Sequence, residues 1–90
     1  MELVILEQAK KDLAYWKASG NIKIQKRISA LIEDTLAHPF TGIGKPEALK
    51  GNLQGKWSRR INDEHRMIYS VADGKIYLFV LSLRYHYKKD

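Results

Sequence analysis

The chain of 90 residues contains no cysteine, which excludes disulfide scaffolds, thiolate metal sites and cysteine nucleophiles. It has no apolar run near the ~18–20 residues that a bilayer span needs. Its first residues also lack the basic and apolar regions of a signal peptide. From these two absences we expect a cytoplasmic protein without a membrane partner. Because domains typically contain about 100–150 residues, we also expect one domain over residues 1–90.

Acidic residues are the scarcer charge. The sequence has 10 Asp and Glu residues against 16 Lys and Arg residues, a net charge of +6. The excess lies in the second half, since residues 1–44 carry a net +1 and residues 45–90 a net +5. Such a distribution favours a polyanionic partner such as a nucleic acid, contacted mainly by the second half.

Proline and glycine are rare outside one segment. Residues 39–56 hold both prolines and four of the six glycines, which predicts a loop. Loops longer than about 12–15 residues in compact domains usually bind or react with something. We therefore expect functional residues in this loop.

Apolar spacing predicts the elements on either side of the loop. We expect helices where apolar residues recur every three or four positions, with Asn21 capping the second helix and Pro39 ending it. Short runs rich in β-branched and aromatic residues predict strands. The expected strands are residues 3–6, 57–61, 66–71 and 76–84. The expected helices are residues 7–19 and 22–37, with His38 outside the second helix. This β-α-α-β-β-β order predicts an α+β fold with both helices on one face of a mainly antiparallel, twisted sheet.

Hairpin register predicts a pair of arginines. If residues 62–64 form a three-residue turn, Ile61 faces His65, and Arg60 lies directly opposite Arg66 on one sheet face. Two guanidinium groups side by side repel each other, and a bound phosphate would relieve that repulsion. The alternative is a solvated strand face with no ligand.

The second hairpin leaves the side of His86 open. A three-residue turn at residues 72–74 would pair Val71 with Lys75 and place His86 on the Arg66 face. A two-residue turn at Asp73 and Gly74 would send His86 to the opposite face.

Three further residues could carry chemistry. Glu47, set among lysines in the glycine-rich loop, could act as a general base or simply form a surface salt bridge. His86 could donate a proton near physiological pH, or be an ordinary surface residue. Tyr87 could stack on an unpaired base, whereas Trp57 and Tyr85 are as readily explained as core residues. The three histidines lack close metal-ligand spacing, so we expect no metal site.

Several of these residues form a recognisable pattern. The sequence resembles the YoeB/Txe branch of the RelE-like bacterial toxins from the first strand to Tyr87. The resemblance rests on five motifs: Asp12-Leu13-Ala14-Tyr15-Trp16, Pro39-Phe40-Thr41-Gly42-Ile43-Gly44-Lys45-Pro46-Glu47, Asn52-Leu53-Gln54-Gly55-Lys56-Trp57-Ser58-Arg59-Arg60-Ile61, Glu64-His65-Arg66 and Arg84-Tyr85-His86-Tyr87.

The resemblance implies a microbial-ribonuclease-like fold and a toxin of a type II toxin–antitoxin system. It implies ribosome-dependent cleavage of mRNA in the A site without metal or cofactor, with Glu47 as general base, Arg66 stabilising the phosphate and His86 as general acid. The residues expected to help bind RNA are Arg60, Tyr87, Lys45, Lys50 and Arg59.

The resemblance also implies partners. These are the ribosome with its mRNA, a second copy of the chain, and a YefM/Axe-like antitoxin whose acidic segment covers the active site. One departure is that the chain continues three residues past Tyr87. The alternative function is a non-catalytic basic module that binds RNA or DNA.

Overall fold

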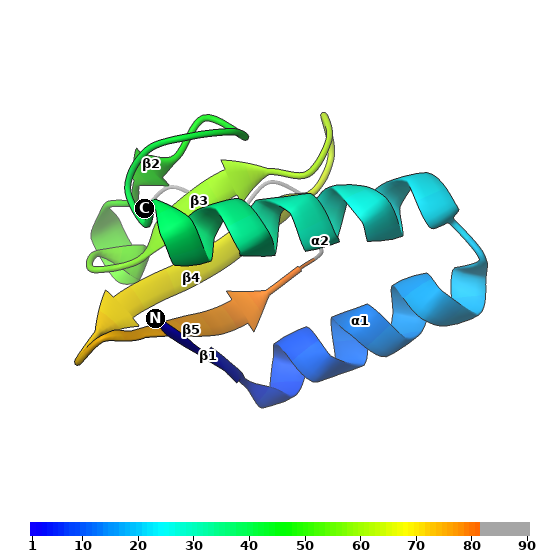
Figure 1. Ribbon diagram of the computed structural model, residues 1–90, viewed down its shortest axis with the longest axis horizontal. Coiled ribbons are helices and arrows are strands. Elements are labelled where there is room, and N and C mark those ends of the chain that lie inside the picture. The colour runs from blue at the N-terminus through cyan, green and yellow to red at the C-terminus, as the bar shows by residue number, and fades with distance from the viewer. Residues whose placement is uncertain (82–90) are drawn as a thin grey trace.

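The computed structural model describes residues 1–81. The elements follow in the order β1 (Glu2–Ile5), α1 (Glu7–Ser19), α2 (Ile22–Ala37), β2 (Glu47–Ala48), a 3₁₀ turn (Gly51–Leu53), β3 (Trp57–Arg60), β4 (Arg66–Ala72) and β5 (Lys75–Val80). In Figure 1, α2 lies in front of β3 and β4, and α1 runs below it. Among residues 1–81, no helix combines the length and apolar character that crossing a membrane requires.

Local signals explain the helix boundaries. α1 ends at Gly20, which has a φ of 75° and donates its backbone N–H to the carbonyl of Lys17, as glycine at a helix C-terminus commonly does. The Asn21 side chain accepts a hydrogen bond of 3.1 Å from the N–H of Ile24 and so caps α2. α2 ends at Ala37, two residues before Pro39. The predicted cap and end of the second helix are thus confirmed.

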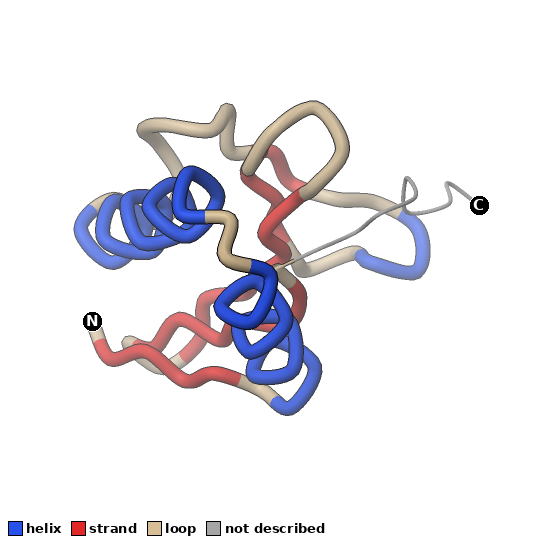
Figure 2. The backbone as a smooth tube through the Cα atoms, turned by 90° about the vertical axis from the view of Figure 1, so that its right-hand side faces the viewer, coloured by secondary structure: helices blue, strands red, loops and turns tan. Residues whose placement is uncertain are grey.

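The sheet has five strands in the order β1-β5-β4-β3-β2. β1 pairs parallel with β5, and all other neighbours are antiparallel. The four predicted strands are present, but the fifth, β2, was expected to be loop. The expected α+β fold is confirmed, with α1 and α2 seen nearly end-on beside each other in Figure 2.

The core lies between the helices and one face of the sheet. Ile28 and Leu31 of α2 pack in one cluster with Met67, Tyr69 and Leu78 of the central strands, all at most 2% exposed. Burial of such side chains is the main source of folding free energy. The odd-numbered residues of β3 and β4 therefore face the helices, and the even-numbered residues face the other way.

The first hairpin has the predicted register. Arg60 pairs with Arg66, and the N–H of Ile61 donates to the carbonyl of His65 over 2.9 Å. The three-residue turn at residues 62–64 is confirmed.

Of the two alternatives for the second hairpin, the structure has the two-residue turn and not the three-residue turn. Ala72 pairs with Lys75 across a two-residue turn in which Asp73 and Gly74 both have positive φ, 53° and 72°. This geometry suits the twist of a hairpin. A bulge then shifts the register, so that Tyr69 pairs with Leu78 but Ile68 pairs with Val80. Before the bulge, the even-numbered Leu78 lies on the Tyr69 face, and after it, the even-numbered Val80 lies on the Ile68 face. His86 and the predicted strand residues 82–84 lie outside the described residues.

Candidate active site

Three predicted site residues share the sheet face that points away from the helices. Glu47 of β2 pairs directly with Ser58 of β3, which in turn pairs with Ile68 of β4. Directly paired residues project from the same face of a sheet. Arg60 and Arg66 form the pair two positions along and hence project from that face as well. The structure thus brings together a carboxylate and two guanidinium groups contributed by three adjacent strands.

Arg66 is held by the turn that precedes it. Its Nη1 donates to the carbonyl oxygens of Asn62 (2.8 Å) and His65 (3.1 Å). These bonds use only part of the five-donor guanidinium fork, so the group keeps donors that can bind an anion.

Arg60 is anchored through its backbone. Its N–H donates to the carbonyl of Gly44 over 2.7 Å, which joins β3 to the loop ahead of Glu47. Its guanidinium lies 3.3 Å from a carboxylate oxygen of Asp63, whose side chain is fully exposed. An exposed ion pair of this kind is worth at most about 1 kcal/mol, so a bound phosphate can compete with it.

The two predicted lysines differ in their relation to this site. Lys45 is exposed and lines a pocket of about 310 Å³ together with Gly44, Arg60 and Asp63. Lys50 is also exposed, but it precedes the 3₁₀ turn and is not among the residues lining that pocket. Lys45 is therefore the lysine that the fold places beside Arg60.

Arg59 does not fit the prediction that it contacts RNA phosphate. Its side chain is 0% exposed because, next to Arg60 in a strand, it points to the opposite face. Its guanidinium donates to the carboxylate of Asp34 (2.6 Å) and to the backbone carbonyls of Thr41 (2.8 Å), Ile43 (3.0 Å) and His38. Arg59 ties the loop that leads to Glu47 onto α2, and its role is structural.

Asp34 and Tyr69 complete this buried network. Hydrogen bonds from Arg59 and from the N–H of Ile43 lower the pKa of Asp34 below its ordinary value. Burial raises the pKa of Tyr69, whose hydroxyl donates to the carbonyl of Pro39 (2.7 Å) and accepts from Arg59. Neither residue was found from the sequence. The alternation of side chains along a strand could have indicated them. If Arg60 points to solvent, its neighbour Arg59 points into the core, where a buried guanidinium needs hydrogen-bonding partners.

The remaining predicted residues are placed as follows. Trp57 is half-buried and packs against Phe40, with ring centroids 4.8 Å apart. His65 is buried against Trp16, with ring centroids 4.9 Å apart. Within residues 1–81, no group of three His, Cys, Asp or Glu side chains could hold a metal ion. His86, Tyr85 and Tyr87 lie outside the described residues.

Comparison with known proteins shows which family the sequence and the fold are similar to. A model of the YoeB-like toxin of bacterial type II toxin–antitoxin systems matches residues 6–87. Toxin YoeB of Escherichia coli K12 is 47% identical over 87 residues, covering 97% of this chain and 100% of the relative. Two solved Staphylococcus aureus structures are each 39% identical and cover 97% of this chain and 98% of theirs. One is a heterotetrameric YoeB–YefM toxin–antitoxin complex (TM-score 0.83), and the other is a YoeB dimer (TM-score 0.84).

Proposed function

Because this chain belongs to the YoeB-like toxin family of bacterial type II toxin–antitoxin systems, we propose that it is an endoribonuclease that cleaves mRNA in the ribosomal A site and thereby inhibits translation. The observation that carries the proposal is the shared sheet face of Glu47, Arg60 and Arg66. Cleavage of RNA through its own 2′-hydroxyl requires a base, a cation at the phosphate and an acid. The first two types of group stand together on this face.

The proposed reaction uses these groups in sequence. Glu47 removes the proton from the 2′-hydroxyl, and the 2′ oxygen attacks the adjacent phosphorus. Arg66 stabilises the negative charge of the pentacoordinate phosphorane, and Arg60 and Lys45 help to hold the phosphate. As the bond from phosphorus to the 5′ oxygen breaks, His86 protonates that oxygen. The products are a 2′,3′-cyclic phosphate and a 5′-hydroxyl, and the mechanism needs no metal or cofactor.

The other residues expected to bind RNA would position the substrate. Tyr87 would stack on a base near the cleaved bond, and Lys50 would contact a more distant phosphate. The ribosome would hold the message in place, which converts cleavage into a reaction between pre-positioned groups. The protein would then act in the cytoplasm, where ribosomes translate.

The partners follow from the solved relatives. The S. aureus toxin occurs as a dimer and in a heterotetrameric complex with its YefM antitoxin. By analogy, we propose that this chain dimerises and is neutralised by a YefM-like antitoxin. An acidic antitoxin segment would suit the Arg60 and Arg66 face, because it would satisfy the same guanidinium groups as the phosphate.

The test is primer extension on an mRNA in a purified bacterial translation system, with and without ribosomes. We expect cuts at the occupied A site that depend on ribosomes. Glu47→Gln should reduce cleavage about 10²–10⁴-fold, the usual contribution of a general base, while ribosome binding is retained. Glu33→Gln is the matched control, since Glu33 is an exposed carboxylate on α2, and it should cleave at the wild-type rate.

Three results would contradict the proposal. Binding without cleavage by the wild-type chain would indicate the alternative, a non-catalytic RNA-binding module. Loss of cleavage in the presence of a chelator, at constant ribosome integrity, or products bearing a 5′-phosphate, would refute the metal-independent mechanism.

A further inference from the structure

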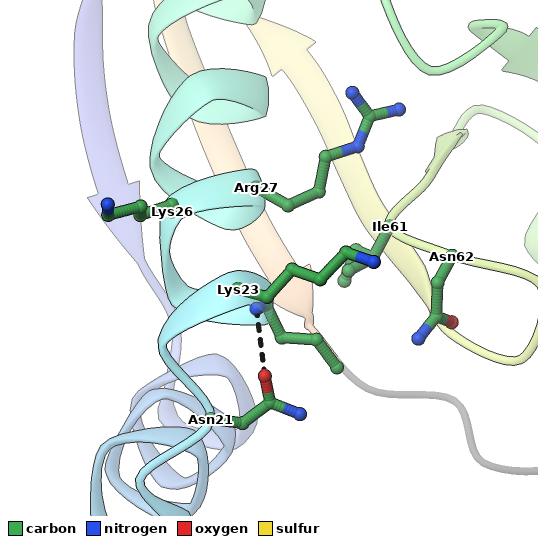
Figure 3. A pocket seen from close by; sticks show the side chains of 7 residues that line it. Asn21, Lys23, Lys26, Arg27, Ile61 and Asn62 are labelled. Carbon is green, nitrogen blue, oxygen red and sulfur yellow. Dashed lines mark hydrogen bonds between the residues drawn. The ribbon is translucent and has the colours of Figure 1, made fainter.

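A second, larger pocket lies beside the candidate active site. It has a volume of about 630 Å³ and lies between the first half of α2 and the β3–β4 turn. Its lining residues are Asn21, Lys23, Ile24, Lys26, Arg27, Ile61 and Asn62. Figure 3 shows Lys23 and Arg27 projecting from α2 toward Ile61 and Asn62, whereas Lys26 extends from the opposite side of the helix.

The polar groups of this pocket are hydrogen-bond donors. The side-chain oxygen of Asn21 accepts from the N–H of Ile24, and that of Asn62 accepts from the N–H groups of Glu64 (2.9 Å) and His65 (2.7 Å). Since these backbone bonds fix which amide atom is oxygen, each side chain is left with its NH₂ group to offer a ligand. Ammonium, guanidinium and amide NH₂ groups together suit an anion.

The pocket has cations but no carboxylate in its lining. Lys23 and Arg27 supply two positive charges on the side of Ile61 and Asn62, and no Asp or Glu lines the pocket. Arg27 also donates one hydrogen bond of 3.2 Å to the carbonyl of Arg60. The excess positive charge in this pocket is therefore not neutralised locally.

The pocket adjoins the smaller pocket that contains Arg60 of the candidate active site. Arg27, Ile61 and Asn62 line both this pocket and the 310 Å³ pocket that contains Lys45 and Arg60. The two pockets form one groove, here called the α2 groove, which runs from Lys23 past Arg27 to Arg60. Asp63 is the single acidic residue in the lining of either pocket.

We propose that the α2 groove binds the sugar–phosphate backbone of the RNA strand whose cleaved phosphate lies at Arg60 and Arg66. The proposal rests on the proposed function. An RNA strand carries a negative charge at every nucleotide, so a strand held at Arg60 presents further phosphates along a connected, donor-lined groove. Lys23 is the binding residue that this proposal adds.

The test measures RNA affinity apart from cleavage. The probe is a fluorescent 12-nucleotide single-stranded RNA with 2′-O-methyl riboses, which cannot be cleaved through a 2′-hydroxyl. Its dissociation constant is determined by anisotropy between 50 and 300 mM salt. Each phosphate contact in single-stranded nucleic acid contributes about 0.7 to the slope of log K against log salt concentration. We expect Lys23→Ala to reduce the magnitude of that slope by about 0.7 and to weaken binding several-fold at the lowest salt.

Lys10→Ala is the matched control. Lys10 is exposed near the start of α1, as Lys23 is near the start of α2, and it lines neither pocket of the groove. Its removal changes the net charge equally and should leave the slope unchanged. Removing a cation from the first turn of a helix does not weaken the helix, because the macrodipole disfavours positive charge there. Reduced binding by Lys23→Ala therefore cannot be attributed to unfolding of α2.

The outcomes separate the two proposals. Equal slopes for Lys23→Ala and Lys10→Ala would overturn the groove, even if the wild type cleaves mRNA as proposed. A slope change confined to Lys23→Ala would support the groove, even if no cleavage were observed. If Lys23→Ala weakened binding of an acidic polyglutamate peptide but not of the RNA, the groove would be a protein-binding surface and the proposal would be wrong.

Discussion

Two adjacent arginines show how strand geometry assigns different roles to identical side chains. Arg59 points to the helices, where its guanidinium is enclosed by Asp34, by Tyr69 and by three backbone carbonyls. Arg60 points to the other face, where its side chain is 40% exposed. A buried guanidinium is tolerated only when it is paired and hydrogen-bonded, as Arg59 is. We therefore expect the free energy of folding to depend on Arg59, and the proposed binding of RNA to depend on Arg60.

Replacing each arginine by methionine tests this division. Arg59→Met leaves buried carbonyls without donors and should lower the free energy of unfolding by about 2–4 kcal/mol. Arg60→Met removes only an exposed ion pair and should change it by at most about 0.5 kcal/mol. Urea unfolding followed by circular dichroism measures both. Equal losses for the two variants would show that Arg59 is no more important to the fold than its exposed neighbour.

At the scale of elements, the loop from residue 38 to Glu47 fits closely against α2. Gly42 has a φ of 116°, and a Cβ atom at this position would lie 1.9 Å from the carboxylate oxygen of Asp34 that binds Arg59. Gly55 has a similar φ of 93°, but a Cβ there would meet nothing within 4 Å. The two glycines thus separate the effect of backbone conformation from that of steric contact.

We expect Gly42→Ala to be clearly more damaging than Gly55→Ala. Both variants carry the cost of a positive φ, roughly 1–2 kcal/mol. Gly42→Ala must in addition separate Asp34 from the loop, which should lower the melting temperature further and displace Glu47 and Lys45. Thermal unfolding and the cleavage assay together measure this difference. A Gly42→Ala variant as stable and active as Gly55→Ala would mean that the loop is not held by this contact.

The sequence predicted the long elements better than the short ones. α2 and the Arg60–Arg66 pair follow from apolar spacing, an Asn cap and turn length. β2 contains only Glu47 and Ala48, both exposed, so no apolar alternation marks it. It exists because its backbone pairs with β3, and that pairing places Glu47 on the arginine face. The bulge in β5 could not be predicted for a similar reason, because the apolar run of this strand is compatible with either register.

At the scale of the whole molecule, the buried network predicts how stability varies with pH. Asp34 has a pKa lowered from 3.8 by its bonds to Arg59 and Ile43. A carboxyl whose folded pKa is lowered adds stability above its unfolded pKa, and this contribution is lost as the pH falls through the folded pKa. The network should therefore hold at neutral pH and loosen in acid.

Comparison of wild type with Asp34→Asn isolates this effect. The variant should be less stable than wild type at pH 7, and the difference should shrink as the pH falls below about 4 toward 2. Urea unfolding at several pH values gives both curves. A difference that stays constant across this range would show that the charge of Asp34 does not stabilise the fold.

The pairing of β1 with β5 joins the two ends of the described chain. Among the strands of residues 1–81, β1 lies at the edge of the sheet and pairs with β5 alone. Leu81, directly after β5, is hydrogen-bonded to Asp12 and Trp16 of α1. During synthesis, β1 and α1 are made before their partner β5. Domains fold as units once their interacting segments are available. A nascent chain therefore cannot pair β1 with its partner until residues 75–81 have emerged, although the Arg60–Arg66 pair between β3 and β4 is made earlier.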